Sequence, residues 1–446
     1  MNDIFFSDPW WLVLIKVLIL FVLLLVWTIF NVWYERRLVG KMQHRLGPIM
    51  NGPLGLGQAV ADGTKALLKE DFRPTKADPI VFNLAPILTA VAAFTTWTVI
   101  PFGGEVTMFG HQTRLQLTDL PVSVLFILAI ASIGIYGIVL AGWASNSTYS
   151  LLGSLRSSAQ MISYEVAMGL SLVGVFMFSG SMSTFGIVEA QAAPIGGTIF
   201  SGWYALLLIP SFIIYCISMV GETNRAPFDL PECESELVSG YITEYSGFRY
   251  ALYFLAEYIN MATVSAVATT LFLGGYRPPW STVMDNWLMG TPAAFLTNPW
   301  WGPLWFMIKV QLLISVFVWL RGTLPRFRYD QFMDLGWKKL IPISLYWIMG
   351  IALVRYGIGA GWFANTTVLI VIGVVILAML VYAFWPQKTQ EETAAPVQFD
   401  PAEPFDPFAG GYPVPPRPGQ RLPELAGVVS STSAATEEST TEGADS

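Results

Sequence analysis

Nine apolar runs, each close to the length that spans a bilayer, constrain this chain more than any other feature of its sequence. A transmembrane helix needs about 20 consecutive apolar residues. The first run is too long for a signal-peptide core and has no small-residue cleavage site after it, so we expect it to be retained as a helix. The runs cover approximately residues 9–33, 79–101, 120–142, 159–179, 200–221, 248–272, 300–320, 340–358 and 364–385.

The composition agrees with these runs, because 54% of the 446 residues are hydrophobic and the mean hydropathy is +0.54. Such a chain is too apolar for a soluble protein of this size. We therefore predict an all-α polytopic integral membrane protein with about nine transmembrane helices, an amphipathic interfacial helix and a disordered C-terminal tail.

The chain divides into a transmembrane helical domain, 1–385, and a tail, 386–446, that is rich in proline and acids. The tail holds ten prolines, ten acids and three bases, so it accounts for the whole net charge of -7. It cannot bury enough apolar surface to offset its ordering entropy, and we predict that it is disordered. The remaining body is neutral, so nothing indicates a nucleic-acid partner.

The loop charges predict how the helices are oriented. Lysine and arginine gather in the loops 34–78, 143–158, 222–247 and 321–339, whereas the intervening loops hold only Arg114 and Arg277. Since cytoplasmic loops carry the positive charge, we expect the N-terminus outside and the four basic loops in the cytoplasm. An odd number of spans places the tail in the cytoplasm too. The expected location is the inner, cytoplasmic membrane.

Loop 34–78 contains a helical pattern. Gln58, Asp62, Lys65 and Lys69 recur at helical spacing with apolar residues between them, which predicts a short amphipathic helix at the membrane interface. Asp62 and Lys65 could line an entrance. The spacing alone favours a surface helix with a solvated charged stripe.

Four ionisable residues fall inside predicted spans: Lys16, Glu165, Glu257 and Lys309. Each costs roughly 2.5–3.5 kcal/mol if it is left unpaired in the membrane. Buried pairs such as Glu165–Lys16 could lock helices together. The alternative is a proton relay, because desolvation moves a carboxyl group toward neutral titration.

The stretch 221–258 concentrates acids in a chain that is only 12% charged. Apolar residues such as Phe228 and Tyr241 are interleaved with the acids, which favours a packed loop over a simple acidic surface. The arginines near residues 36 and 326 could neutralise it, although solvated positive loops are the alternative. The seven acids are Glu222, Asp229, Glu232, Glu234, Glu236, Glu244 and Glu257.

The sequence shows no redox centre or nucleotide site. His44 and His111 fall on opposite sides of the membrane, so no bis-histidine haem site is predicted. Cys216 and Cys233 do not form a CxxC motif, and GxGxxG, P-loop and HExxH motifs are absent. If the chain belongs to an enzyme, other subunits must carry the electrons.

Five stretches closely resemble the signatures of one family, the quinone-site membrane subunit of respiratory complex I, the bacterial NADH–quinone oxidoreductase. The resemblance covers about residues 10–358, with the motifs in family order. The stretches are YERRLVGKMQHRLGP (34–48), ADGTKALLKED (61–71), AQMISYE (159–165), GETNRAPFDLPECESELVSGYITEYSGFRYALYFLAEY (221–258) and RGTLPRFRYDQFMDLGWKKLIP (321–342).

This resemblance implies a subunit of a proton-pumping enzyme, without a redox centre or covalently bound cofactor of its own. Quinone is the substrate that enters from the bilayer, while NADH, flavin and iron–sulfur clusters belong to partner subunits. The implied partners are the peripheral-arm iron–sulfur and quinone-site subunits, small membrane subunits, antiporter-like subunits and lipid.

The resemblance also assigns site residues, and it assigns none as catalytic and none as metal ligands. The quinone chamber falls on Glu35, Arg36, Arg37, Asp62, Lys65, Arg225, Asp229, Glu232, Glu234 and Glu236. The proton path falls on Glu165, Glu222 and Glu257. The second arginine-rich loop falls on Arg321, Arg326 and Arg328.

Two features depart from the family pattern: Cys233 replaces another small residue, and the ninth span with the tail exceeds the eight-span core of shorter homologues. Two other functions would also explain the buried acids. A membrane anchor of an energy-converting hydrogenase or formate-oxidising complex would share the acids but use no quinone. A free-standing secondary transporter would use buried acids for ion coupling.

Overall fold

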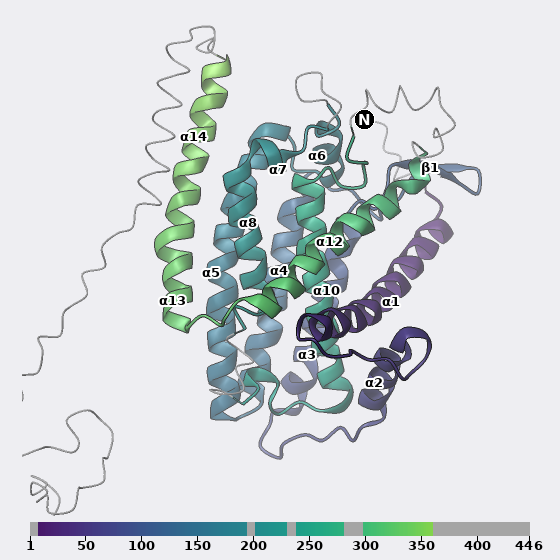
Figure 1. Cartoon of the computed structure of the whole chain (residues 1–446), viewed down its shortest axis with the longest axis vertical. Helices are drawn as coiled ribbons and strands as arrows, with labels where there is room; N and C mark the ends of the chain where they lie inside the picture. The colour runs from purple at the N-terminus through teal and green to yellow at the C-terminus, as the bar shows by residue number, and fades with distance from the viewer. Residues whose placement is uncertain (1–7, 194–200, 230–237, 281–297, 360–446) are drawn as a thin grey trace, which may run out of the picture. The chain divides into compact units, whose positions relative to one another are not determined.

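The computed structural model describes residues 8–193, 201–229, 238–280 and 298–359. Within these residues, seven helical segments are long and apolar enough to cross a membrane (Figure 1). The prediction of a helical, polytopic membrane protein is therefore confirmed. The ninth predicted span and the tail lie outside the described residues. The seven segments are α1 (Trp10–Met42), α3 with η3 (Pro79–Thr95, Thr96–Val99), α4 (Ser123–Ala144), α5 (Thr148–Ser179), α10 (Gly247–Phe272), α12 after η6 (Pro299–Trp301, Gly302–Thr323), and α13, η7 and α14 in succession (Tyr329–Asp334, Leu335–Leu340, Ile341–Gly359).

The fifth predicted span, 200–221, is wrong as one continuous helix. The chain forms a single turn, α7 (Tyr204–Leu207), and then the 14-residue α8 (Ile209–Glu222). Leu208 separates them with φ -117° and ψ 49°. The break has a local cause, because Pro210 lacks the N–H that would continue the α7 hydrogen-bond ladder and is favoured in a first helical turn.

Two predicted spans are too short at the end that carries charge. α1 continues nine residues beyond the predicted end at 33 and stops just before Gln43, because its apolar run passes into a polar stretch that contains no proline. Glu35 thus lies within the helix and not in the following loop. α5 begins at Thr148 instead of 159. Glu165 therefore lies about 26 Å along this helix from its first residue, whereas the predicted start at 159 would place it about 9 Å in.

A β-hairpin is the part of the fold that an all-α prediction missed. β1 (Glu105–Met108) pairs antiparallel with β2 (His111–Arg114). The two residues between the strands, Phe109 and Gly110, both have positive φ, 51° and 85°, as a two-residue type I′ turn requires. Four-residue strands escape a search for 20-residue runs. We call this side of the bundle the hairpin end.

The opposite side, the α2 end, carries α2 (Gly57–Leu68) after a short turn, η2 (Pro53–Gly55). The amphipathic helix predicted in loop 34–78 is therefore present. α2 contacts α1 and α10. Two further short helices are α6 (Thr184–Ala190) at the hairpin end and η4 (Gly240–Ile242), which contacts α5.

α10 is the central helix of the bundle. It packs against α1, α2, α3, α8 and α12, and nearly every residue from Tyr258 to Phe272 is buried. This stretch is rich in alanine, serine and threonine, and small residues allow membrane helices to approach closely. Large aromatic side chains such as Trp97 and Phe306 fill the space around it. Glu257 directly precedes this buried stretch, and its side chain is only 14% exposed.

Candidate functional site

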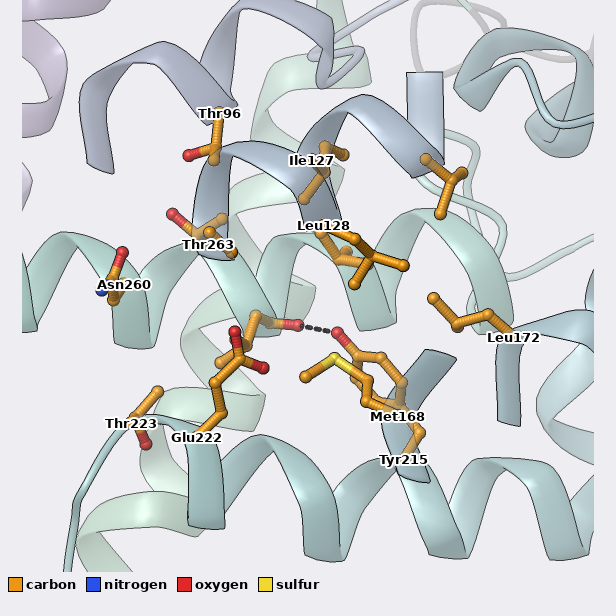
Figure 2. Close-up of a pocket in the computed structure, with 14 residues that line it drawn as sticks. Thr96, Ile127, Leu128, Met168, Leu172, Tyr215, Glu222, Thr223, Asn260 and Thr263 are labelled. Atoms are coloured by element: carbon orange, nitrogen blue, oxygen red, sulfur yellow. Dashed lines mark hydrogen bonds between the residues drawn. The ribbon is translucent and has the colours of Figure 1, made fainter. Parts of the chain in front are cut away.

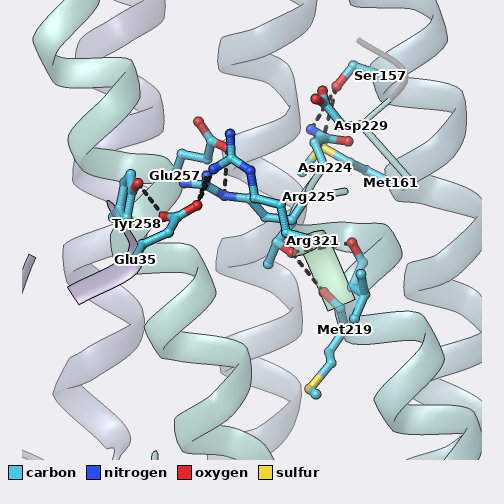
Figure 3. Close-up of polar contacts among 12 residues, drawn as sticks. Glu35, Ser157, Met161, Met219, Asn224, Arg225, Asp229, Glu257, Tyr258 and Arg321 are labelled. Atoms are coloured by element: carbon cyan, nitrogen blue, oxygen red, sulfur yellow. Dashed lines mark hydrogen bonds and ion pairs between the residues drawn. The ribbon is translucent and has the colours of Figure 1, made fainter. Parts of the chain in front are cut away.

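Glu35 of α1 is the hub of a buried charge cluster near the α2 end (Figure 3). Only 5% of the residue is exposed. Its carboxylate accepts a hydrogen bond from the hydroxyl of Tyr258 on α10, at 2.6 Å, and another from the guanidinium of Arg321 on α12. A second guanidinium, that of Arg225, lies 3.8 Å away. One carboxylate therefore joins three helices and the segment that follows α8.

Arg225 extends this cluster to the acid within α10. Its Nε lies 3.0 Å from Oε1 of Glu257, and its guanidinium carbon lies 4.3 Å from the ring centroid of Tyr258. Both side chains of the ion pair are largely buried. An unpaired buried charge is very costly, so these partners hold one another in place. The predicted chamber residue Arg225 and the predicted proton-path residue Glu257 thus belong to one cluster.

The segment after α8 is held in position by α5 and by an aromatic stack. Nε2 of Gln160 donates to the carbonyl oxygens of Gly221 and Phe228, at 2.8 and 2.9 Å. The Phe228 ring packs on Phe332, with centroids 4.4 Å apart. Buried backbone carbonyls need such partners. Arg225 therefore projects from an ordered turn.

The arginine-rich loop after α12 is fastened to the same turn. Nη2 of Arg326 donates to Oδ2 of Asp229 at 3.1 Å, and the backbone N–H of Phe327 donates to the Pro227 carbonyl at 3.2 Å. Arg328 is not part of this contact, because its side chain is 79% exposed and pairs with Asp330. Arg321, predicted in the same loop, lies within the last turn of α12, so the three arginines have separate environments.

α2 is fastened to α1 by a pair on the surface. Arg36 donates to the carboxylate of Asp62, and Gln58 donates to the same carboxylate at 2.9 Å. Partial burial raises the pKa of Asp62, but these two hydrogen bonds and the Arg36 charge outweigh it, so the pKa is lower than usual. Arg37 donates to the Leu54 carbonyl at 3.0 Å, while Lys65 is exposed.

Glu222, the last residue of α8, projects into a small cavity between α4, α5, α8 and α10 (Figure 2). Within the described residues, its buried Oε2 has no hydrogen-bond partner. The cavity volume of about 30 Å³ exceeds what one water needs. Its wall is mainly apolar, with polar groups from Thr96, Asn260 and Thr263. Such a site can hold water against a carboxyl group.

Glu165 and Lys16 do not form the ion pair that the sequence left open. The Glu165 carboxylate accepts a hydrogen bond from Ser132 of α4. Lys16 lies at the hairpin end, where its Nζ is 2.7 Å from Oδ2 of Asp8 and also donates to Thr113 and to the Arg114 carbonyl. The two residues therefore have separate partners, with Lys16 at the hairpin end and Glu165 near the middle of α5.

Three predicted chamber acids, Glu232, Glu234 and Glu236, lie outside the described residues. Sequence reasoning missed Tyr258, although it directly follows Glu257, because a tyrosine in an apolar helix gives no charge signal. It also missed Asn260 and Thr263, whose i, i+3 spacing places both on one side of α10.

The fold and the site define a polytopic helical membrane protein that encloses ionised side chains between its helices. The NADH dehydrogenase family profile matches residues 15–352. The chain belongs to this family.

Three relatives are each named as the H subunit of an NADH-quinone oxidoreductase. That of Cutibacterium acnes is 62% identical over 434 residues, covering 96% of both chains. That of Streptomyces avermitilis is 52% identical, covering 95% of this chain and 90% of the relative. That of Frankia alni is 56% identical, covering 79% and 74%.

Proposed function

We propose that this chain is the membrane subunit of a proton-translocating NADH–quinone oxidoreductase that forms the quinone access chamber and begins the coupling to proton transfer. The observation that carries the proposal is the arginine of the 225–229 turn held between Glu35 and Glu257. It joins the segment assigned to the chamber to a carboxylate within a membrane helix. The names of the relatives support the same enzyme.

The chamber lies where α1, α2 and the 225–229 turn meet at the α2 end. Arg36, Asp62, Arg225 and Asp229 supply charge there. Glu232, Glu234 and Glu236 are assigned to the same chamber by the family resemblance alone. The exposed apolar face of α1 nearer this end, which includes Val26 and Phe30, suits contact with an isoprenoid tail. Polar groups toward the head and apolar groups toward the tail are what a quinone requires.

Quinone reduction changes the charge next to this cluster of ion pairs. A quinone takes up two electrons and two protons to become a quinol, and the electrons come from iron–sulfur clusters on partner subunits. Negative charge on the reduced head group attracts Arg225, which weakens its ion pairs with Glu35 and Glu257. A carboxylate that loses its arginine binds a proton more readily. In this way an electron-transfer event changes the protonation of groups inside the membrane.

Glu222 and Glu165 continue the path from Glu257 into the bundle. Glu222 faces a cavity that can hold water, and water can carry a proton between carboxyl groups that do not touch. Proton transfer through Glu222 and Glu165 leads toward the small and antiporter-like membrane subunits. NADH and flavin remain on the peripheral arm, which docks on the cytoplasmic side at the basic loops. This orientation places the N-terminus outside and the tail in the cytoplasm.

Glu222→Gln tests the proposal in the assembled complex. The variant should assemble and reduce an artificial electron acceptor with NADH at the normal rate, because that reaction needs only the peripheral arm. Its NADH–quinone turnover should fall by about tenfold or more, as for the loss of a positioned proton-transfer group. Glu70→Gln, at an exposed acid, is the matched control and should keep normal turnover. Normal quinone turnover coupled to protons in Glu222→Gln would contradict the assigned role.

A further inference from the structure

Lys309 of α12 is a buried cation that the proposed mechanism leaves unused. Its Nζ donates to three backbone carbonyls, those of Leu273 at 2.6 Å, Gly275 at 3.0 Å and Arg277 at 2.6 Å. The three carbonyl acceptors match the three N–H donors of a lysine ammonium. No carboxylate within the described residues forms an ion pair with it, and the charge is compensated by carbonyl dipoles and by the Trp203 ring, whose centroid lies 5.0 Å away.

These three carbonyls belong to the turn that ends α10 at the hairpin end. Gly274 and Gly275 have φ of 73° and 55°, a left-handed backbone that turns the carbonyls toward one point. Cations near the C-terminus of a helix are stabilising because they complement the helix dipole. The ammonium of Lys309 therefore fixes α12 to the end of α10.

A second buried polar side chain fixes the same helix end from another direction. Gln191, only 1% exposed, donates from Nε2 to the carbonyls of Thr270 and Leu271 at 3.1 and 3.2 Å, and its Oε1 accepts from the Gly274 N–H at 3.0 Å. Every one of these Gln191 contacts joins a side-chain amide to a backbone group, and neither gains or loses a proton. The Gln191 contacts therefore hold the hairpin end of α10 independently of the protonation of the carboxylates.

The other end of the same helix pair is held by groups that do change charge. α12 also carries Arg321, twelve residues after Lys309 and so about 18 Å further along the helix. Arg321 binds Glu35, which accepts from Tyr258 beside Glu257. One helix thus supplies a cation to a carbonyl turn at one end of α10 and a cation to a carboxylate cluster at the other.

We propose that Lys309 is a positioning residue that fixes the hairpin end of α10, so that Glu257 and Tyr258 stay in register with Arg225 and Arg321 while the carboxylate end changes charge. Lys309 acts through α10 and does not touch quinone. The inference rests on the proposed role of Glu257, and its test separates the two.

The test is a double-mutant cycle on NADH–quinone turnover, normalised to artificial-acceptor reduction in the assembled complex. Lys309→Met and Glu257→Gln should each lower turnover by about tenfold, the first because small misplacements of reacting groups are costly. If Lys309 acts through Glu257, the turnover of the double variant should be within about twofold of the turnover of Glu257→Gln alone, since the effects of coupled residues are not additive. Lys309→Arg should retain most of the turnover.

A double variant about a hundredfold slower than the wild type would overturn the inference, because independent effects multiply. Unchanged turnover in Lys309→Met would overturn it as well. If Lys309→Met does not assemble, Lys309→Gln, which keeps N–H donors without charge, takes its place in the same cycle. Normal turnover in Glu257→Gln alone would instead contradict the proposed function. Lys16→Met is the matched control, and its effect should multiply with that of Glu257→Gln.

Discussion

Arg225 lies 3.0 Å from Glu257, between the turn that follows α8 and the helix at the centre of the bundle. The same guanidinium is 3.8 Å from Glu35 of α1, so one cation is shared by two carboxylates. A shared cation can shift toward either carboxylate when one of them gains a proton or when a negative charge approaches. In the proposed function, this shared cation links a quinone at the α2 end to the acids inside the membrane.

Removing the charge of Glu35, the hub of the cluster, should lower the stability of the assembled complex. Glu35→Gln leaves Arg225 and Arg321 facing a neutral amide, and loss of one partner from a buried ion pair destabilises by about 3–5 kcal/mol. We expect less assembled complex in the membrane and a lower temperature of thermal inactivation. Arg328→Ala, which removes an exposed arginine, should change stability by less than about 1 kcal/mol. Equal stability of the two variants would contradict the buried hub.

Tyr258 contributes a hydrogen bond and a ring, and two variants separate them. Tyr258→Phe loses the bond to the Glu35 carboxylate, worth about 1.5–3 kcal/mol for a charged partner, but keeps the ring under Arg225. Tyr258→Leu also loses the cation–π contact, worth about 0.5–2 kcal/mol. The temperature at which the purified complex is inactivated should be highest for the wild type, lower for Tyr258→Phe and lowest for Tyr258→Leu. A Tyr258→Phe variant as stable as the wild type would show that the hydroxyl bond contributes nothing.

The Asp62–Arg36 pair should depend on pH and salt. Because the pKa of Asp62 is lower in the folded chain than in an unfolded one, the pair stabilises at pH values above the ordinary aspartate pKa. That stabilisation is lost as the pH falls below about 4, through the lowered pKa.

Both side chains of this pair are more than one third exposed, so the effect is less than about 1 kcal/mol and is screened by salt. Protease cleavage near α2 should increase modestly in Asp62→Asn at low salt and match the wild type at high salt. A large increase that salt does not remove would show that Asp62 has a buried partner.

Close packing beside Glu222 predicts a sensitive glycine. A Cβ on Gly221 would lie 2.7 Å from the Tyr164 ring, so Gly221→Ala must displace the ring or α8, which costs about 1–3 kcal/mol. Gly63→Ala is the matched control, because a Cβ at Gly63 meets nothing within 4 Å and alanine favours the helix by about 0.4–1 kcal/mol. The temperature of thermal inactivation should fall only for Gly221→Ala. The reverse ranking would mean that Tyr164 does not pack there.

Apolar length predicted seven membrane-spanning segments of this fold, because the bilayer imposes a length that a sequence displays directly. It did not predict where the helices end within polar sequence, so Glu35 was expected after α1 and lies inside it. The short strands around Phe109 and the break at Leu208 are too local to be detected by a search for apolar runs of about 20 residues.

The pairing of the charges was beyond the sequence for a different reason. Lys16 and Glu165 are both partly buried and opposite in sign, yet they bind Asp8 and Ser132 respectively. Which acid meets which base depends on helix rotation and crossing, and these follow from packing of all neighbours at once. The arginine after α8 was assigned to the chamber by resemblance, and only the structure shows it beside Glu257.

A photoreactive quinone, applied to the assembled complex, provides the sharpest test of the proposed chamber. After illumination, mass spectrometry of the digested complex locates the labelled peptides. We expect labels on this chain at the end of α1, on α2 or on the 225–229 turn, and their loss when unmodified quinone competes. Competed labels found solely on other subunits, with none on these three segments, would contradict the quinone chamber proposed for this chain.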